Sequence, residues 1–359
     1  MVNKMNENKV LVGMSGGVDS AVSALLLKNA GYDVGGITMK VWSDTEAVTD
    51  EADTSSDENI SDAKKIADSL GIPHYSVALG DTFKKEVIER FISDYAQGRT
   101  PNPCVECNRA LKFGSLFGEA QRLGYEFLAT GHYARIIKGE NGDFLLKKAK
   151  DESKDQSYFL WSIKKEHLGR ILFPLGDYTK PEIREIAAQA GFSNAHRSDS
   201  QDICFIPDGD YVSFIEKHSE LKFPAGNFVD IKGNVLGKHE GIINYTIGQR
   251  KGLGIAMGYP IFVGDKNAKS NTVTLCSNDE LYKKEFTAGR VNLLADNAIL
   301  GKERLLVKIR YRHTPSLATV SMEDEKLKVV FDEPQRAIAS GQSAVLYDGD
   351  TVIGGGIID

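Results

Sequence analysis

The fold of this chain is decided near its start, by the stretch VLVGMSGGVDS at residues 10–20. Its first half is apolar and predicts a short buried strand, and residues 18–30 show a helical pattern that ends at Gly31. The glycines between them let backbone amides turn toward an anion, and the helix start adds partial positive charge. We therefore predict a strand–loop–helix phosphate site, although a tight turn capped by serine would explain Ser-Gly-Gly alone.

Two better-known phosphate sites do not match this loop. It has no lysine where a Walker A loop requires one, and it lacks the G-x-G-x-x-G spacing of a dinucleotide fingerprint. A site for a different phosphate ligand is the remaining expectation.

The alternation of strand and helix continues through the first domain expected, residues 1–207. Strands are expected at 10–14, 34–42, 74–79 and 126–130, and helices at 18–30, 63–70, 83–95 and 109–123. Thr179-Lys180-Pro181-Glu182 matches a capping box and predicts a helix that ends at Ala190. This order is typical of an α/β fold with a parallel, doubly wound sheet.

The pattern changes after Asp208. Residues 226–264 hold nine glycines and no helical period, which indicates a small, loop-rich β module within an expected domain 208–283. Short alternating strands are expected in the last domain, 284–359, at 305–312, 318–322, 327–331, 343–347 and 351–358. They predict a C-terminal β-barrel.

Composition excludes several classes of protein. The 359 residues are 41% hydrophobic and 26% charged, as in ordinary globular proteins. No apolar run reaches the roughly 20 residues of a membrane span, and the polar start, Met1 to Lys9, does not resemble a signal peptide. A cytoplasmic protein with no membrane partner is expected.

The net charge of −6 does not exclude a nucleic-acid partner, because it is unevenly spread. Residues 44–62 hold eight acids and no Lys or Arg, so the rest of the chain is at +2; we expect a solvated loop there. In the expected strand 305–312, Lys308, Arg310 and Arg312 alternate onto one face, which offers a row for phosphates. A solvated barrel face is the alternative.

The four cysteines fall into two groups. Cys104 and Cys107 form a Cys-x-x-Cys pair before an expected helix, where the helix dipole and Lys112 would lower the pKa of the Cys107 thiol, and Cys204 lies 97 residues further on. Cys276 shares one face of an expected strand with threonines and is expected to be structural. Inert thiols or a zinc site remain alternatives, but a closed zinc site needs four ligands and would require a histidine.

Seven segments, in this order, span almost the whole chain. They are Ser15–Ser20, Thr100–Asn108 with Lys112-Phe113, Thr130–Ala134, Lys154–Tyr158, Phe173–Gly176, Asp202–Phe205 and Tyr245–Gly252. The first resembles the PP-loop of enzymes that cleave ATP to AMP and pyrophosphate. Together they resemble the tRNA-specific 2-thiouridylases of the MnmA type.

This resemblance implies an ATP-dependent enzyme that adenylates the C2 oxygen of the tRNA wobble uridine (U34), releases pyrophosphate, and puts sulfur in place of that oxygen. The implied ATP contacts are Gly13, Met14, Ser15, Gly16, Gly17, Val18, Asp19, Ser20, Met39 and Gly131. We expect Mg²⁺ to accompany the ATP near Asp19.

The resemblance also implies contacts with tRNA, which we expect to be the Lys, Glu and Gln acceptors. The implied residues are Asn102, Pro103, Cys104, His132, Lys154, Asp155, Gln156, Lys308, Arg310, Tyr311, Arg312 and Gln342. The sulfur would come from a cysteine desulfurase or a sulfur-relay protein, Cys204 would carry it as a persulfide, and Cys107 would be the second catalytic cysteine.

Cys104 departs from the pattern, since some members of the family carry Asp at this place. Two readings stay open: Cys104 modulates a site of two free thiols, or Cys104, Cys107 and Cys204 ligate a [4Fe-4S] cluster with one open iron. Two other functions are alternatives, a PP-loop synthetase acting on a small molecule and a non-catalytic RNA-binding module. Neither gives the paired and distant cysteines a role.

Overall fold

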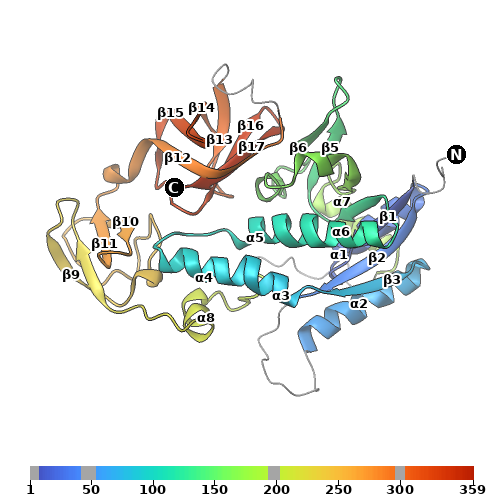
Figure 1. Cartoon of the computed structure of the whole chain (residues 1–359), viewed down its shortest axis with the longest axis horizontal. Helices are drawn as coiled ribbons and strands as arrows, with labels where there is room; N and C mark the ends of the chain where they lie inside the picture. Colours follow the sequence, from blue (N-terminus) through green and yellow to red (C-terminus); the bar gives the residue numbers. More distant parts are fainter. Residues whose placement is uncertain (1–7, 42–53, 193–202, 296–303) are drawn as a thin grey trace. The chain divides into compact units, whose positions relative to one another are not determined.

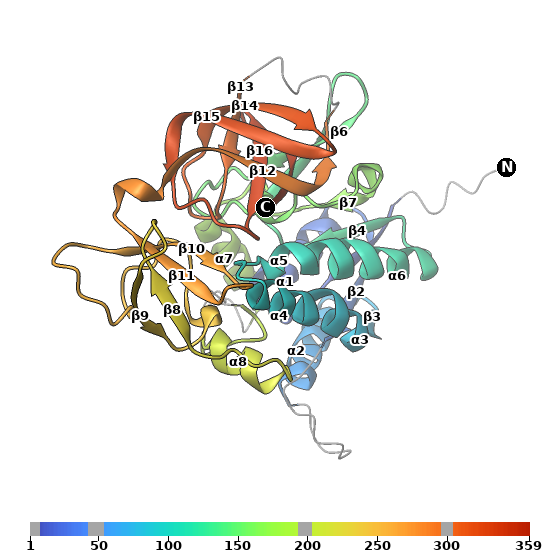
Figure 2. The ribbon, with the colours of Figure 1, turned by 60° about the vertical axis from the view of Figure 1, so that its left-hand side comes forward.

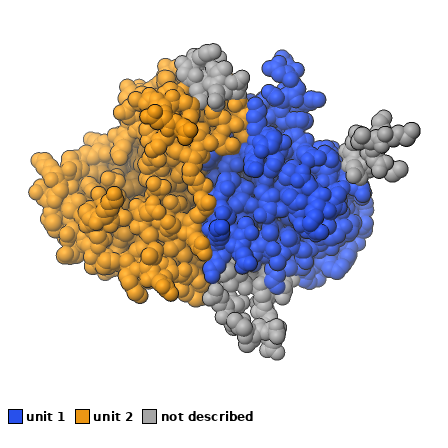
Figure 3. Space-filling view, in the orientation of Figure 1, with its two compact units in different colours: residues 1–87, 104–201, 350–352 blue, residues 88–103, 202–349, 353–359 orange. Residues whose placement is uncertain are grey.

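The computed structural model describes residues 8–41, 54–192, 203–295 and 304–359. The chain divides into two compact units, which Figure 3 colours separately. Unit 1 comprises residues 1–87, 104–201 and 350–352, and unit 2 comprises residues 88–103, 202–349 and 353–359. Each unit is described by itself.

Unit 1 is built on a five-stranded parallel sheet with the strand order β3-β2-β1-β4-β7. The strands are β1 (Lys9–Gly13), β2 (Asp33–Lys40), β3 (His74–Ala78), β4 (Phe127–Thr130) and β7 (Ile171–Leu172). The four expected strands therefore form, with ends that differ by one or two residues among those described. The order reverses at β1, which has β2 on one side and β4 on the other.

Helices cover both faces of this sheet, and Figure 1 shows α2 and α6 on opposite sides of it. One face packs against α1 (Val18–Asn29), α2 (Thr54–Leu70) and α7 (Lys180–Gln189), in a core that includes Val10, Ala63 and Ile183. On the other, Leu116 of α6 (Leu116–Arg122) lies against Gly13 at the end of β1. The doubly wound α/β fold is thus confirmed.

Two stretches of the chain differ from expectation. Residues 54–62 of the acidic segment belong to α2 rather than to a solvated loop, since Ala63, Ile66 and Ala67 bury one face of that helix; residues 44–53 lie outside the described part. The helix expected from residue 109 begins at Pro103, whose fixed φ suits a first helical turn.

Both remaining long helices of the first half contain π-helical turns. One runs through α3 (Gly80–Phe83), a π-helix at Lys84–Ile88 and α4 (Glu89–Ala96). The other runs through α5 (Pro103–Glu106), a π-helix at Cys107–Ser115 and then α6. Single π-helical turns are rare and cluster at functional sites.

Unit 1 also holds the hairpin of β5 (Ala134–Lys138) and β6 (Phe144–Lys148), against which Thr351 pairs at Lys147. Two 3₁₀ turns follow, at Ser157–Phe159 and Lys165–Arg170. The capping box at Thr179 is confirmed, because Glu182 Oε2 accepts hydrogen bonds from Thr179 N at 2.6 Å and from Thr179 Oγ1 at 2.8 Å.

The glycine-rich part of unit 2 forms a four-stranded sheet with the order β10-β11-β8-β9. Its strands are β8 (Gly226–Val229), β9 (Val235–His239), β10 (Phe262–Asn267) and β11 (Thr272–Cys276), and α8 (Tyr211–Lys217) precedes them. Short 3₁₀ turns lie at Ile242–Asn244 and Asp279–Leu281. Figure 2 shows the small size of this sheet beside long connecting loops.

The C-terminal strands close into a six-stranded barrel, as expected. They are β12 (Tyr282–Leu293), β13 (Arg304–Lys308), β14 (Ser316–Glu323), β15 (Lys326–Arg336), β16 (Ser343–Asp348) and β17 (Thr351–Ile358). A pairing between β12 and β17 closes the order β12-β15-β14-β13-β16-β17. Val307, Val320 and Leu346 are among the fully buried residues of its core.

One barrel strand is shorter than expected. β13 ends at Lys308, which pairs with Val345, and the chain bends from Ile309 onward. Arg310 then donates a hydrogen bond from Nη2 to the Ala337 carbonyl. The expectation that Lys308, Arg310 and Arg312 share one face of a strand is therefore wrong, because the strand stops before the last two.

Among the described residues, no helix is both long enough and apolar enough to cross a membrane.

Candidate active site

The glycine loop follows the strand at which the order of the sheet reverses. In open α/β sheets, ligands bind at this switch point, beyond the carboxyl ends of the strands. Ser20 closes the loop: its Oγ donates to the Gly17 carbonyl at 3.0 Å and accepts from Ser15 N at 3.3 Å. Gly16 has a φ of +73°, a conformation that glycine adopts without strain. The sequence-based phosphate loop thus has the expected strand–loop–helix setting.

Gly131 brings the end of β4 close to this loop. A Cβ atom at Gly131 would lie 2.9 Å from the Asp19 carbonyl carbon and 3.0 Å from Ser20 N. Because that approach leaves no room for a side chain, only glycine fits there. The position explains how a residue 111 places after the loop can border the same site.

Asp19 is held by two residues that the sequence did not reveal. Lys180 Nζ lies 2.8 Å from Asp19 Oδ1 and 2.9 Å from Oδ2, and Tyr133 donates its hydroxyl proton to Oδ1 at 2.9 Å. Lys180 is only 5% exposed. In the sequence, Lys180 is recognisable only as part of the capping box, and no spacing of residues indicated that it would contact Asp19.

These contacts bear on the Mg²⁺ expected near Asp19. Both carboxylate oxygens already accept hydrogen bonds from an ammonium group, which competes with a metal for the same lone pairs. Across the described ranges, no group of three or more His, Cys, Asp or Glu side chains is arranged to hold a metal ion. The protein's own donor set therefore does not fit a dedicated metal site at Asp19, and we derive no step through one.

His132, next to Gly131, is buried and hydrogen-bonded on both ring nitrogens. Its Nδ1 lies 2.8 Å from Thr130 Oγ1, and its Nε2 lies 3.3 Å from Lys112 Nζ. Burial, and then the charge of Lys112, hold the pKa of His132 well below its usual value. A neutral ring that accepts from Lys112 and donates to Thr130 follows. These bonds occupy the side chain that was expected to contact tRNA.

The cysteine pair lies on the helix that begins at Pro103. Cys104 is exposed and stands in the first turn, whereas Cys107 is half-buried and opens the π-helix. The first-turn position expected for Cys107 therefore belongs to Cys104. Asn108 donates from Nδ2 to the Phe159 carbonyl at 3.0 Å, which fixes the start of the π-helix to the segment after Gln156.

An ion-pair group flanks the same helix. Arg109 donates to Glu106 Oε2 at 3.0 Å and to Glu86 Oε2 at 2.8 Å. Burial lowers the pKa of Arg109, but the two carboxylates outweigh that effect and the pKa is raised. The guanidinium thus links the helix that carries the cysteine pair to Glu86 of the preceding helix.

Of the expected segment 154–156, two residues serve the protein's own structure. Asp155 is buried and accepts from Ala149 N at 3.0 Å and from Ser157 Oγ at 2.8 Å. Gln156 accepts from Tyr133 N at 2.9 Å. Lys154 instead lines an open hollow of about 600 Å³ that is also bordered by Lys180, Arg184, Asp151 and Glu185, so charges of both signs line it.

Met39, an expected ATP contact, lies on β2 in unit 1, whereas the remaining expected cysteine and tRNA-contact residues lie in unit 2. Cys204 is exposed and follows residues 193–202, which are outside the described part. Lys308 Nζ lies 5.4 Å from the centre of the Tyr311 ring, and Arg312 is exposed. Gln342 contacts the segment that leads to Asn102. Cys276 is buried in β11, which confirms it as a structural residue.

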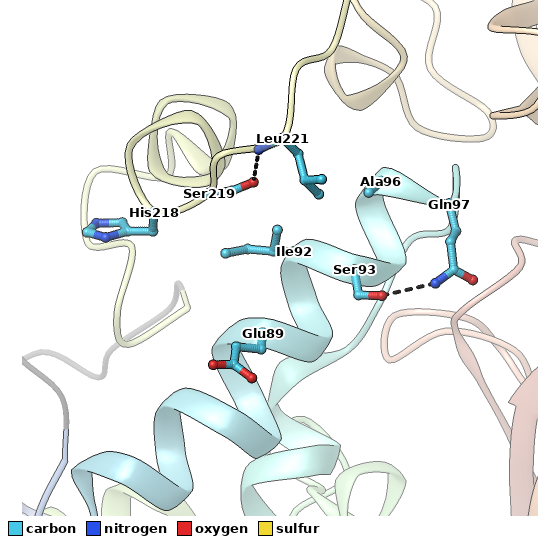
Figure 4. Close-up of a pocket in the computed structure, with 8 residues that line it drawn as sticks. All are labelled: Glu89, Ile92, Ser93, Ala96, Gln97, His218, Ser219 and Leu221. Carbon is cyan, nitrogen blue, oxygen red and sulfur yellow. Dashed lines mark hydrogen bonds between the residues drawn. The ribbon is translucent and has the colours of Figure 1, made fainter.

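A second hollow, of about 370 Å³, opens between α4 and the residues that follow α8 (Figure 4). It is lined by Glu89, Ile92, Ser93, Ala96, Gln97, His218, Ser219 and Leu221. None of the expected site residues is among them.

Comparisons with known proteins place this geometry in a family. Residues 8–208 match the family model described as tRNA methyl transferase HUP domain. Residues 212–277 match the tRNA methyl transferase PRC-barrel domain, and residues 283–358 match the aminomethyltransferase beta-barrel domain.

Relatives match along nearly the whole chain. The tRNA-specific 2-thiouridylase MnmA of Clostridioides difficile is 48% identical over 353 residues, which is 98% of each chain. Those of Treponema denticola and Acetivibrio thermocellus are 49% identical over 361 residues and 47% identical over 358 residues, at 98% or more of each chain. The domain descriptions name methyl transfer, but full-length relatives are the more specific guide. The chain therefore belongs to the family of tRNA-specific 2-thiouridylases.

Proposed function

We propose that the chain is an ATP-dependent sulfurtransferase that converts the wobble uridine (U34) of tRNA to 2-thiouridine. The observation that carries the proposal is the SGGVDS loop at the switch point of a parallel sheet, in a chain whose near-full-length relatives are 2-thiouridylases. The three expected domains would divide the work: residues 1–207 bind ATP and hold Cys107, and residues 208–283 and 284–359 contact tRNA.

The first step would activate the base. The C2 carbonyl of uridine has no leaving group, and adenylation turns its oxygen into one. The uridine oxygen attacks the α-phosphate of ATP, and pyrophosphate leaves. The amides of the loop and the start of α1 offer donors to the phosphates. Lys180, buried at Asp19, neutralises that carboxylate beside the same turn, so that it does not repel the phosphates.

The second step would deliver sulfur. The terminal sulfur of a persulfide on Cys204 attacks C2, and AMP departs with the original oxygen. The Cys107 thiolate attacks Cys204 Sγ and breaks the S–S bond. The transferred sulfur is thereby reduced while two thiolates are oxidised to a Cys107–Cys204 disulfide, so a thiol reductant must restore the enzyme. Water must be kept out, because hydrolysis would undo the adenylate.

The sulfur source and the tRNA are part of this proposal. The exposed Cys204 suits loading by a cysteine desulfurase or a relay protein. Asn102, Pro103 and Cys104 would face the target base, and Lys154 and Arg312 would contact the backbone. An anticodon-loop base is single-stranded and can be splayed into such a site. The Lys, Glu and Gln acceptors are the expected substrates.

The test is reconstitution with purified chain, ATP, a cysteine desulfurase with cysteine, and a tRNA transcript. Mass spectrometry of digested nucleosides should show 2-thiouridine, and pyrophosphate release should rise when tRNA is added. A transcript with cytidine at the wobble position is the matched control. The proposal would be refuted if pyrophosphate release rose when a small acid was added in place of tRNA, or if it rose with neither the acid nor the tRNA.

A further inference from the structure

A tight turn of the barrel is hydrogen-bonded to the segment that leads to the cysteine helix. The segment is Arg99–Pro101, and the turn is 339–342, between β15 and β16; both belong to unit 2. Thr100 donates its amide proton to the Ser340 carbonyl at 2.8 Å. Gln342 donates from Nε2 to the Thr100 carbonyl at 2.9 Å, with a longer contact of 3.5 Å to the Pro101 carbonyl.

Glycine at position 341 makes this approach possible. Its φ is +88°, and a Cβ atom there would lie 2.9 Å from Arg99 Cβ and 2.9 Å from Thr100 N. The turn is itself fixed to the barrel, because Gly341 N donates to the Ile358 carbonyl at 2.9 Å and Ile358 N donates back to the Gln342 carbonyl at 2.8 Å. A rigid strand therefore backs the contact.

The other end of the segment is fixed as well. Gly98 follows α4 with a φ of +78°, and a Cβ atom there would meet Lys266 Cβ at 3.4 Å. Lys266 is buried and donates from Nζ to the Tyr245 carbonyl at 2.7 Å. Arg99 N donates to the Asp94 carbonyl at 2.8 Å. Both ends of residues 98–101 are thus held before the chain reaches Asn102.

We propose that Gln342 and Gly341 are positioning residues, which hold Arg99–Pro101 so that Asn102 and Pro103 are set against the target base. The role rests on the proposed function, since that function supplies the base. It differs from a direct tRNA contact by Gln342, because the side-chain amide is already donated to two backbone carbonyls. A misplacement of about 1 Å at a reacting centre can cost a hundredfold in rate.

Hydrogen–deuterium exchange on the tRNA-free full chain tests the clamp without any reaction. Gln342→Glu keeps the shape but loses the donor, and Gln342→Ala removes the side chain. In both, exchange of the Thr100 amide should rise about tenfold, while amides of β14 stay protected and report an intact barrel. Gln335→Ala is the matched control, because Gln335 accepts from Ser316 within the barrel at 3.0 Å and should leave Thr100 unchanged.

Kinetics supply the second readout. Gln342→Glu should lower kcat for thiolation about tenfold and leave the KM for tRNA within about twofold. Unchanged Thr100 exchange in both variants, or a raised KM with kcat intact, would overturn the positioning role. If the wild-type chain forms no thiouridine, the proposed function fails, and the exchange data still judge the clamp alone.

Discussion

Lys180 and Asp19 lie 161 residues apart in the chain, yet the ammonium group of one touches both carboxylate oxygens of the other. The pair joins the first turn of α1, directly after the phosphate loop, to the first turn of α7. It therefore fixes the spacing of two helix starts beside the expected ATP phosphates. Both helix starts favour an anion there, and the ammonium group of Lys180 offsets the negative charge of the Asp19 carboxylate.

Changes at this pair and in the adjoining loop should stop the chemistry more than the fold. We expect Asp19→Ala, Ser15→Ala and Lys180→Met each to lower tRNA-dependent AMP formation at least about a hundredfold. Lys180→Met should also cost about 1–3 kcal/mol in the free energy of unfolding, because it leaves Asp19 without its cation. Rates by AMP release and unfolding by urea measure the two effects.

A matched control is Lys64→Met, which breaks an exposed pair with Asp68 at 3.0 Å on α2. Such a pair is worth about 0.3–0.5 kcal/mol, and AMP formation should stay normal. Normal AMP yield from Asp19→Ala and Ser15→Ala together would remove the basis for a PP-loop.

Lys308, at the end of β13, and Arg312, which follows the strand, should bind tRNA phosphates. Replacing Lys308 and Arg312 by Gln should weaken tRNA binding and flatten its salt slope by about 0.7–0.9 for each phosphate that the variant no longer neutralises. Arg310 is left in place because it hydrogen-bonds the barrel at Ala337. Binding titrations at several salt concentrations measure the slope. Lys328→Gln, which breaks a 3.5 Å pair with Glu323, is the control. If the double variant has the same salt slope as the wild-type chain, Lys308 and Arg312 belong to a solvated barrel surface.

Cys204 should carry the sulfur. Cys204→Ser should block thiolation and still permit adenylation, since no thiol takes part in forming the adenylate. Transfer of labelled sulfur and release of pyrophosphate separate the two steps. Cys276→Ala, which alters a buried thiol of β11, should keep both activities. Wild-type sulfur transfer by Cys204→Ser would contradict the role.

Cys104 decides between free thiols and a cluster. We favour free thiols, because the persulfide route needs only Cys107 and Cys204. Cys104→Asp should then stay active, with no bound iron and no visible absorbance, when prepared without oxygen. Activity that follows iron content across serine variants of all three cysteines would favour the cluster instead.

Stability should depend on pH through Lys266. Burial lowers the pKa of this amine from 10.5 to about 8. Between these values the unfolded chain binds a proton that the folded chain has released, so the free energy of unfolding should rise with pH, by at most about 1.4 kcal/mol per pH unit. Urea unfolding from pH 8 to 10 should show this rise in wild type relative to Lys266→Met. Lys269→Met, which changes an exposed side chain, is the control and should leave the pH dependence of the unfolding free energy unchanged. If the difference in unfolding free energy between wild type and Lys266→Met does not change with pH, the pKa of Lys266 is not lowered.

Local patterns in the sequence predicted much of the fold. The apolar run at Val10, the glycine at the end of α1 and the capping box at Thr179 each depend on neighbours within a few residues. The strand–helix order then implied the parallel sheet, whereas the strand order and its switch point at β1 came only from the structure. The barrel followed from period-two alternation, although the end of β13 did not, because the bend after Lys308 is stabilised by a bond to the distant Ala337.

The site was predictable only where its residues are close together in the sequence. The local pattern Ser15 to Ser20 was enough to predict an anion loop, whereas Lys180 and Tyr133 come next to it only through folding. The bonds of His132 to Thr130 and Lys112, and of Gln342 to Thr100, likewise depend on tertiary structure. The burial, the charge state and the hydrogen-bond partners of such residues depend on contacts between distant parts of the chain, which a local sequence pattern cannot predict.

The π-helix at Cys107–Ser115 makes this stretch sensitive to its length. In a π-helix the hydrogen-bonded residues are five positions apart. The side chain of Ser115 spans the same five positions, since its Oγ donates to the Ala110 carbonyl at 3.2 Å. Deleting one residue would restore α-helical bonding with little rotation of the flanking turns, because each π-helical turn spans one residue more than an α-helical turn. The number of residues in this stretch, rather than their side chains, therefore decides whether Cys107 opens a wide π-helical turn or a regular α-helical one.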